Sequence, residues 1–389
     1  MYNIVTIKEK IKLYKNHEEA NNIELISFEE NGFNVVSQKG LYNVGDKAIY
    51  IEPDYNLKEC ELFMDFIAPN GDIKKSKLGS NNRIRAVKFN FRIINNLDTI
   101  NVVYSQGILL PYKEEYINII EENVYKYEKP ENTNPDTKYG VSKSNSTFPK
   151  GLYRTDETNI NKVWNNMIFP NDYVLTEKVD GSSITLWYDC GNFGVCSRNL
   201  NIPVYIKKKV GSRNKTLIEK LLFWKKYDLN IYETFLNLEN DFIKYSIDYI
   251  NLFQEIKEKY DIHKDVKFAL RGELNGSMFK GSGNNNNPSN KVTNNIKIYS
   301  LDYWSLDSSV CYIEPEWNLN DFINWIKSDF NFSIERCKVI HNNTITSKEE
   351  LINICENYFK ENLIEGIVVR STDSKFSAKY MNLEYDSKK

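Results

Sequence analysis

Thr176-Glu177-Lys178-Val179-Asp180-Gly181-Ser182-Ser183 joins two runs that alternate like β-strands and is the most informative stretch of the chain. In the run that ends at Lys178, the side chains of Val174, Thr176 and Lys178 share one face. Asp-Gly between two strands is a strong hairpin signal, which would make Lys178 a solvated residue on an edge strand. The alternative is functional: the turn presents the Lys178 amine to a phosphate, which the amine attacks once it has lost its proton.

The composition is that of a globular protein. The 389 residues are enough for two or three domains, and 51 basic residues nearly balance 53 acidic ones, for a net charge of −2. Bulk charge therefore does not indicate a nucleic-acid partner, which would need a local basic groove. The six cysteines form no CxxC pair, so neither structural zinc nor a disulfide framework is predicted, and a reducing compartment fits. Without a signal peptide or a bilayer-length apolar run, we expect a soluble, cytoplasmic protein with no membrane partner.

Residues 1–125 predict a β-rich domain. Short strand-like runs alternate there with turn signals such as Asn31-Gly32. The runs are Ile23–Phe28, Phe33–Gln38, Ala48–Ile51, Arg83–Phe89 and Ile108–Leu110. Many short strands at this spacing predict a small barrel, and an OB-like barrel fits the size. Residues 126–150 are rich in Pro, Asn, Ser, Thr and Lys and predict a linker.

Residues 151–389 predict a second domain in which strands come first, helices are inserted, and strands return, which is typical of an α+β fold. The expected strands are Tyr173–Lys178, Ile184–Tyr188, Phe193–Ser197, Lys267–Arg271, Ile296–Asp302 and Gly366–Arg370. The expected helices are Leu217–Tyr260, Leu319–Asp329 and Lys348–Asn362. The polar stretch from Gly281 to Asn290 predicts a loop, close to a site if it has a role.

Three polar residues stand at the ends of these strands. Arg198 is most simply a surface charge, but its planar fork also suits a ribose or a 5′-phosphate. Glu273 follows Gly272, which permits close approach of a ligand, although a loop glutamate is the commoner case. Glu365 opens a buried Ile-Val-Val strand and must be paired, protonated or metal-bound if it is not solvated.

Two further segments lie toward the C-terminus. The aromatic strand Lys297–Trp304 is explained by core packing for most of its side chains, although one member could form a wall against a purine ring. In the last segment, Lys375, Ser377 and Lys379 lie on one face. Two lysines there could neutralise triphosphate charge, and a solvated pair is the structural alternative.

Each pattern alone is better explained by structure. Their order, from the Lys178 motif through Ser-Arg, Gly-Glu, the aromatic strand with its aspartate and the Glu365 strand to Lys-x₃-Lys, resembles the covalent nucleotidyltransferase superfamily of DNA ligases, RNA ligases and mRNA capping enzymes. The resemblance covers essentially the whole second domain. Lys39–Ile51 resembles the signature of a subgroup of ATP-dependent RNA ligases in which an OB domain precedes the transferase. Only ten residues follow Lys379, so the later OB domain of DNA ligases and capping enzymes is not expected.

The resemblance implies a fold and a reaction. The fold is an N-terminal OB-like β-barrel followed by an ATP-grasp-like nucleotidyltransferase domain of antiparallel sheets and helices. Lys178 would attack the α-phosphate of ATP, AMP would pass to an RNA 5′-phosphate, and a 3′-OH would displace AMP to seal the strand. The implied partners are ATP, Mg²⁺ or Mn²⁺, and RNA or an RNA-containing nicked duplex, and we expect a monomer.

The resemblance also implies roles for individual residues. Lys178, Lys379 and Arg198 would be catalytic, and Asp180 and Glu365 would hold the metal or its water. Nucleotide-binding residues would be Thr176, Glu177, Lys178, Asp180, Gly181, Arg198, Glu273, Leu301, Glu365, Lys375 and Lys379.

Two details depart from the family pattern. Either Lys375 or Ser377 fills the first lysine position of the last motif. The adenine-stacking position, usually aromatic, falls near Leu301, with Tyr299 as the alternative. A DNA ligase, an mRNA guanylyltransferase and an inactive nucleic-acid-binding relative remain as alternatives.

Overall fold

The computed structural model describes residues 2–94, 99–100, 102–127, 148–152, 157–213, 229–260, 266–276, 287, 295–302, 319–372 and 376–386. It divides into two compact units. Unit 1 comprises 1–131, 157–178 and 339–389, and unit 2 comprises 132–156 and 179–338. Lys178 is thus the last residue of unit 1 before the chain enters unit 2. The predicted linker falls largely outside the described residues, and the limits of the predicted domains stay a prediction.

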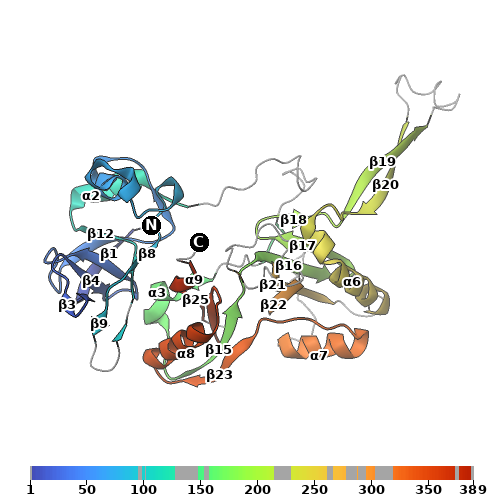
Figure 1. Cartoon of the computed structure of the whole chain (residues 1–389). Helices are drawn as coiled ribbons and strands as arrows, with labels where there is room; N and C mark the ends of the chain where they lie inside the picture. The colour runs from blue at the N-terminus through green and yellow to red at the C-terminus, as the bar shows by residue number, and fades with distance from the viewer. Residues whose placement is uncertain are drawn as a thin grey trace. The chain divides into compact units, whose positions relative to one another are not determined.

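The N-terminal part of unit 1 is a curved, nearly closed sheet (Figure 1). Its strand order is β12-β6-β1-β4-β5. The bounds are β1 Tyr2–Ile11, β4 Ile23–Phe28, β5 Asn34–Gln38, β6 Lys47–Ile51 and β12 Ile108–Pro111. The long β1 pairs with β6 through its first half and with β4 through its second, with a bulge between Ile7 and Glu9 near the start of the second. Such a bulge bends a strand, so one strand can serve two neighbours of a barrel.

Two cores lie on the two sides of this sheet. On β6, Ala48 and Tyr50 join the inner core with Phe28, whereas Ile49 and Ile51 join a second, outer core. The outer core contains Ile120 of α2 (Glu114–Asn123). A strand buried on both faces reads as a continuous apolar run, which is why Ala48–Ile51 stood out in the sequence.

Shorter elements complete this region. They are β2 Tyr14–Lys15, β3 Glu18–Glu19, β7 Tyr55–Leu57, α1 Met64–Ile67, β8 Ala86–Phe89, β9 Ile93–Ile94, β10 Thr99–Ile100, β11 Val103–Gln106 and β13 Val124–Lys126. The strand expected from Arg83 begins only at Ala86.

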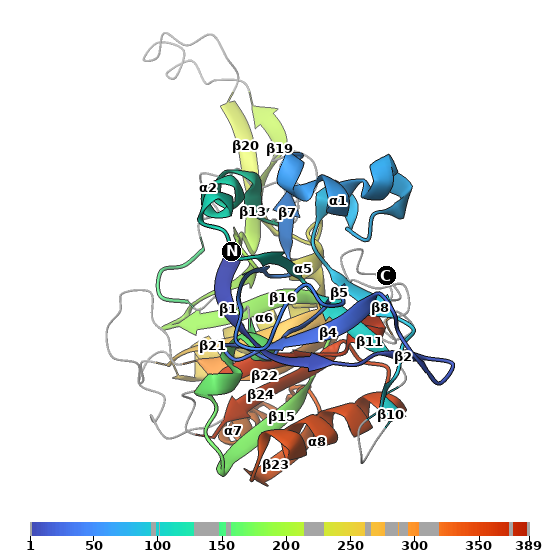
Figure 2. The same ribbon diagram turned by 90° about the vertical axis from the view of Figure 1, so that its left-hand side faces the viewer.

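The second sheet of unit 1 has the order β14-β25-β24-β15-β23. The bounds are β14 Thr158–Asn159, β15 Asn171–Lys178, β23 Val339–Ile345, β24 Gly366–Ser371 and β25 Ser377–Met381. Helix α8 (Lys348–Glu361) runs alongside β15 and β23 (Figure 2) and begins at Ser347, whose hydroxyl accepts from the Glu350 N–H. Its Leu351 and Cys355 pack on Leu175 and Val369, so one face of the sheet is covered by the helix. The short helix α3 (Ile160–Val163) follows β14 directly, and the short helix α9 (Leu383–Asp386) follows β25.

Specific contacts join the two sheets of unit 1. The Gly32 N–H donates to the Asn161 carbonyl at 2.7 Å, and a Cβ on Gly32 would overlap the Trp164 ring. Lys162 also forms an ion pair with Glu52 of the N-terminal region. The N-terminal sheet therefore packs on the segment that leads into β15.

Unit 2 is built on a sheet of order β18-β17-β16-β21-β22. The bounds are β16 Ser182–Asp189, β17 Asn192–Ser197, β18 Asn201–Ile202, β21 Lys267–Asn275 and β22 Asn295–Asp302. Three helices supply apolar residues to its core, namely α5 Asp241–Tyr245, α6 Ile247–Tyr260 and α7 Leu319–Phe330. Leu186, Phe253, Phe268 and Phe322 are fully buried there. One face of this sheet is thus apolar and covered by helices.

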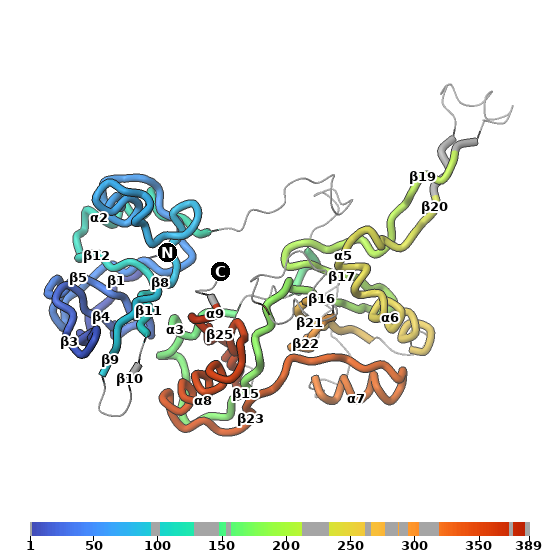
Figure 3. The backbone as a smooth tube through the Cα atoms, viewed as in Figure 1, coloured from blue at the N-terminus to red at the C-terminus, as the bar shows by residue number. Residues whose placement is uncertain are grey.

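The helix predicted over Leu217–Tyr260 was wrong over Leu229–Leu236 and was confirmed over Asp241–Tyr245 and Ile247–Tyr260. Leu229–Leu236 is strand β20, which pairs with β19 (Tyr205–Arg213) in a two-stranded ribbon that extends away from the sheet of unit 2 (Figures 1 and 3). Thr234 and Phe235 are residue types that favour strands over helices. Pairing with β19 satisfies the backbone hydrogen bonds of this segment. Within the described part of that range, helix begins at Asp241, where the Asn240 side chain caps it. Leu217 to Asp228 lies outside the described residues.

Two further findings concern the helices and the cysteines. No helix in the described ranges is long and apolar enough to cross a membrane. Five cysteines are described, and all five are free thiols. Burial raises the pKa of the Cys196 thiol to about 12, so this group stays protonated and unreactive.

Candidate active site

The strand that carries Lys178 has two chemically different faces. Tyr173 and Leu175 point into the core beneath α8. Thr176 and Lys178, at even positions, project from the opposite face. The sheet therefore uses one side for packing and leaves the other for polar side chains.

Lys178 and Glu365 form an ion pair on this polar face. Lys178 Nζ lies 2.5 Å from Glu365 Oε2, and the two side chains are only 24% and 13% exposed. Strand pairing brings them together, because Lys178 is the partner of Gly366, the residue after Glu365. A Cβ on Gly366 would lie 2.6 Å from the Tyr380 carbonyl oxygen, so glycine is needed for the strands to meet here. The sequence placed both residues in the site, and the structure brings them together.

Lys379 lies on the same face, one strand beyond β24. Val368 pairs with Thr176 on one side and with Lys379 on the other, and directly paired residues project to the same side of a sheet. The polar face thus carries Lys178 and Lys379 on strands that flank β24. Lys375, the other lysine expected here, lies outside the described residues.

Ser377 and Arg370 also lie on this face, and both bind Glu157, to which the sequence patterns gave no role. The Ser377 hydroxyl donates to Glu157 Oε2 at 2.5 Å, and Arg370 Nη2 donates to Glu157 Oε1 at 2.8 Å. Glu157 lies more than 200 positions from both partners. No role in the site was predicted for Glu157, and pairing of β14 with β25 brings it here. The Ser377 hydroxyl therefore binds a carboxylate and does not supply the positive charge of a lysine at this position.

Thr176 supplies an unused polar group. Its side chain is 6% exposed, and its Oγ1 has no hydrogen-bond partner among the described residues. A buried hydroxyl without a partner is costly unless something satisfies it. On the face of Lys178 and Lys379, this hydroxyl fits a polar ligand such as a nucleotide.

Glu177 projects to the other side. Its Oε1 accepts a hydrogen bond from the Tyr358 hydroxyl of α8 at 2.6 Å. Strand alternation therefore places its carboxylate on the helix-covered face, opposite to Lys178. The structure does not bring the Glu177 side chain to the polar face.

Asp180-Gly181 is not a hairpin turn. β15 and β16 belong to different sheets, and β15 lies between β24 and β23 rather than at an edge. The hairpin prediction and the solvated-edge interpretation of Lys178 were both wrong. The Asp-Gly pair marks a bend in the chain, but β15 pairs with β24 and β23 whereas β16 pairs with β17 and β21.

The residues after Lys178 are held against β21. A Cβ on Gly181 would lie 2.5 Å from the Leu274 carbonyl oxygen, so this contact requires glycine. Asp180 is buried, and its carbonyl oxygen accepts from Asn287 Nδ2 at 2.7 Å. Asn287 is the described residue of the predicted 281–290 loop, and it is buried in contact with the Lys178 motif.

The unit 2 sheet also has a polar face. Glu273 pairs with Ser183, and Arg271, two residues earlier, pairs with Thr185, so both project opposite to the apolar core. Arg271 Nη2 donates to Asp302 Oδ1 at 2.9 Å and to Ser300 Oγ at 3.0 Å. Arg271 had not been assigned to the site, although its alternation with Glu273 was a usable signal.

The two other predicted residues of unit 2 are Leu301 and Arg198. Leu301 pairs with Leu270 and packs against the apolar core of unit 2, so its side chain is on the face away from Arg271 and Glu273. Arg198 is exposed in the turn after β17, where the Ser197 N–H donates to the Leu200 carbonyl.

The two carboxylates predicted to hold metal, Asp180 and Glu365, belong to different units. Within the described residues, no three His, Cys, Asp or Glu side chains gather closely enough to form a protein-only metal site. Mg²⁺ is commonly held by one or two carboxylates together with water and substrate phosphates, so the donors present suit a cation of that kind.

Comparison with known proteins supports the assignment of the fold. The chain matches the solved RNA ligase of Naegleria gruberi with PPi at a TM-score of 0.65 and 19% identity, covering 100% of this chain and 98% of that one. A variant of that ligase with ATP and Mn matches at 0.64 and 19%, covering 100% and 98%. A second variant, with AMP and Mn, matches at 0.64 and 18%, covering 100% and 99%. At 18–19% identity, this structural similarity establishes a shared fold and no more.

No curated protein sequence matches the chain. The model of the family described as RNA ligase matches residues 171–381, more than half of the chain and the whole span from β15 to β25. The order of motifs predicted this superfamily, and the prediction is confirmed. The chain belongs to the RNA ligase family.

Proposed function

We propose that this protein is an ATP-dependent RNA ligase that seals 3′-OH/5′-phosphate breaks through lysyl-AMP and RNA-adenylate intermediates. The observation that carries the proposal is the pair of Lys178 Nζ and Glu365 Oε2 at 2.5 Å, on the face that also holds Lys379. A poorly exposed lysine beside a carboxylate, with a second cation on the same face, suits attack on a phosphate.

In the first step, the Lys178 amine attacks the α-phosphorus of ATP. A P–N bond forms, the bond to the bridging oxygen breaks, and pyrophosphate leaves. Lys178 must first give up a proton, and the Glu365 carboxylate, which is hydrogen-bonded to the amine, is placed to accept it. Lys379 stabilises the negative charge that grows on the α-phosphate oxygens. Because the displacement is in line, positioning and charge neutralisation are the main contributions of the protein.

Other residues complete the proposed nucleotide site. The Thr176 hydroxyl serves as a polar contact, and Arg198 and Glu273 hold the ribose and the 5′-phosphate. Mg²⁺ or Mn²⁺, when bound through Asp180 and Glu365 or their water, supplies positive charge against the triphosphate. The Naegleria gruberi ligase structures with ATP, AMP, PPi and Mn support this chemistry by analogy of fold.

Labelling with radioactive nucleotide tests the first step. The full-length protein with divalent metal is expected to take up label from α-³²P-ATP, and Lys178→Ala to take up none. Lys360→Ala is the matched control, because Lys360 is an exposed lysine on α8. Label retained by Lys178→Ala would exclude it as the nucleophile, and preference for GTP would favour a guanylyltransferase.

We further propose that the preferred break is a nick whose 3′ end is a ribonucleotide. Sealing of matched nicked duplexes that differ only in the 3′-terminal sugar tests this. Faster sealing of the 3′-ribose nick is expected, and equal sealing of both would favour a DNA ligase. Binding of the duplex with neither label uptake nor sealing would support an inactive nucleic-acid-binding relative.

We also propose that residues 1–125 form an OB-like domain that engages duplex around the break, and that 151–389 form the catalytic domain. Deleting the first domain is a poor test, because its sheet packs on Asn161 and Trp164. A nicked duplex with photoreactive bases beside the break should instead crosslink to peptides within 1–125 of the intact chain. Crosslinks confined to 151–389 would contradict that role.

A further inference from the structure

The ribbon of β19 and β20 is strongly basic on one strand. β19 reads Tyr-Ile-Lys-Lys-Lys-Val-Gly-Ser-Arg and contains no acidic residue, while β20 contains only Glu233. Lys207, Lys208 and Lys209 are all exposed. The chain as a whole is slightly acidic, with a net charge of −2, so this is a local concentration of positive charge.

The three lysines do not share one side of the ribbon. Tyr205, Lys207 and Lys209 alternate with Ile206 and Lys208, so Lys207 and Lys209 project with Tyr205 and Lys208 projects the other way. Lys208 pairs across the ribbon with Glu233, and its Nζ lies 2.5 Å from Glu239 Oε1. Across the part of the chain that the structure describes, Lys207 and Lys209 have no ion-pair partner. The Tyr205 side of the ribbon therefore presents uncompensated charge.

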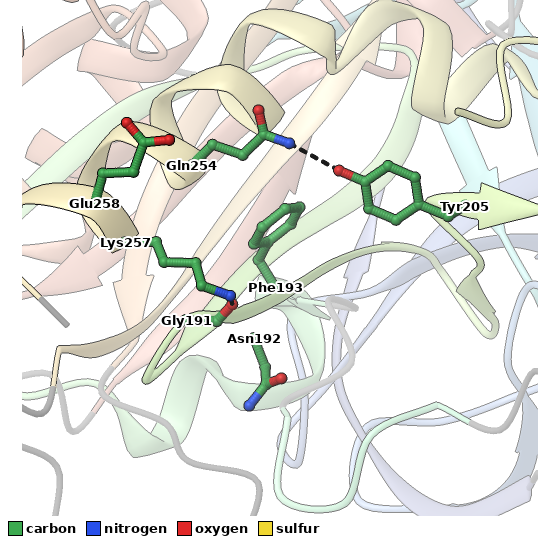
Figure 4. A pocket seen from close by; sticks show the side chains of 7 residues that line it. All are labelled: Gly191, Asn192, Phe193, Tyr205, Gln254, Lys257 and Glu258. Atoms are coloured by element: carbon green, nitrogen blue, oxygen red, sulfur yellow. Dashed lines mark hydrogen bonds between the residues drawn. The ribbon is translucent and has the colours of Figure 1, made fainter. Parts of the chain in front are cut away.

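A pocket opens at the base of that same side. It has a volume of about 740 Å³ and is lined by Gly191, Asn192, Phe193, Tyr205, Gln254, Lys257 and Glu258. Figure 4 shows the Phe193 ring between Tyr205 and Lys257, with Gln254 donating to the Tyr205 hydroxyl at 2.8 Å. Two aromatic side chains and a lysine thus lie next to a basic strand.

The pocket is remote from the proposed nucleotide residues of its own unit. Gly191 and Asn192 lie at the end of β16 and the start of β17, whereas Asp180 precedes the start of β16. β16 runs from Ser182 to Asp189, which is about 23 Å at roughly 3.3 Å per residue. The pocket is therefore too far from Asp180 and Glu273 to be part of that group.

We propose that the Tyr205 side of the ribbon and the pocket at its base bind a single-stranded segment of the RNA substrate. Lys207 and Lys209 contact successive phosphates, and an unstacked base enters the pocket against Tyr205 and Phe193. The proposal rests on the proposed RNA ligase function, which supplies the partner. Single-stranded RNA offers both features that this surface complements, a phosphate chain and bases free to stack on aromatic rings.

Binding of a fluorescein-labelled single-stranded 20-mer RNA to the full chain, followed by anisotropy without ATP, tests the lysines. Lys207→Ala/Lys209→Ala is expected to weaken binding and to reduce the slope of log affinity against log salt by about 1 to 2, because each lost phosphate contact removes about 0.7. Lys208→Ala is the matched control and is expected to bind as the unmodified chain does. Equal effects of both variants, or no effect of either, would overturn the proposal.

A second pair of variants tests the base pocket. Tyr205→Ala is expected to weaken binding about fivefold or more through lost stacking, and Tyr205→Phe, which keeps the ring, to restore it. A fully paired duplex of the same length should be insensitive to Tyr205→Ala; equal loss on that duplex would overturn the base pocket. Label uptake from α-³²P-ATP by the unmodified protein, measured in parallel, reports on the proposed function independently of the ribbon. Normal labelling with unaltered RNA binding by the variants would overturn the ribbon proposal alone.

Discussion

Lys178 and Lys379 lie on the same face of one sheet, on the two strands that flank β24, where they pair with Gly366 and Val368. Neighbouring strands are about 4.8 Å apart, so the two backbones are separated by about 10 Å across the sheet. Long lysine side chains can converge over that distance on one phosphate group. The intervening strand therefore sets the spacing of nucleophile and charge-stabilising cation in the proposed site.

Lys379→Ala should lower the rate of adenylylation by about 10² to 10³, because it removes a cation aimed at charge that develops in the transition state. Lys379→Arg should recover part of the rate, since it keeps the charge but alters the geometry. Single-turnover label uptake from α-³²P-ATP measures both. Lys360→Ala serves as the control, and a Lys379→Ala variant as fast as that control would remove Lys379 from the reaction.

Gly366→Ala should destabilise unit 1, because its Cβ would lie 2.6 Å from the Tyr380 carbonyl oxygen. Relieving this overlap requires the backbone to shift, which costs folding free energy. A cost of about 1–3 kcal/mol is expected from such overpacking. Gly211→Ala is the matched change, since nothing lies within 4 Å of a Cβ at that strand position. Thermal unfolding of both variants distinguishes them, and equal midpoints would show that the sheet accommodates a methyl group beside Lys178.

Glu177→Gln tests whether this carboxylate serves the nucleotide, as its place in the motif predicted, or packing, as its bond to Tyr358 indicates. We expect adenylylation within a few-fold of normal and a loss of stability of about 1–3 kcal/mol, typical of a weakened hydrogen bond to a charged group. Tyr358→Phe should reproduce the loss of stability. A fall in adenylylation as large as that of Lys379→Ala, with unchanged stability, would instead place Glu177 at the nucleotide.

Local patterns predicted the strands of both units well, because alternation and apolar runs reflect burial directly. Ile23–Phe28 and Ala48–Ile51 are examples from the first sheet, and Gly366–Arg370 from the second. The motif order also predicted that Lys178, Glu365 and Lys379 belong to one site. The proposed reaction requires these charged residue types, and the order in which they follow one another along the chain is typical of the superfamily.

Long-range pairing could not be predicted in the same way. The Asp-Gly signal after Lys178 predicted a hairpin, but β15 pairs with strands near the C-terminus and β16 with strands of unit 2. Leu229–Leu236 was predicted as helix because its partner β19 lies outside any local window. Glu157 was given no role in the site for the same reason, since its contacts are with Arg370 and Ser377.

Asn287 provides the last prediction. Its Nδ2 donates to the Asp180 carbonyl at 2.7 Å in a buried position, so it fixes the backbone that follows the nucleophile. Asn287→Ala leaves that carbonyl without this donor, and Asn287→Asp replaces the donor by an acceptor that repels it. Small displacements near reacting groups are costly, so adenylylation should fall by about tenfold or more in both variants, and at least as far in Asn287→Asp.

The control for this effect is Asn343→Ala, an exposed asparagine on β23, which should label at the normal rate. Varying the ATP concentration separates the two possible causes. A positioning role predicts a lower maximal rate with little change in the ATP concentration at half-maximal rate, because Asn287 holds the segment beside the nucleophile rather than the nucleotide. Normal maximal rates in both Asn287 variants would show that Lys178 is positioned without this hydrogen bond.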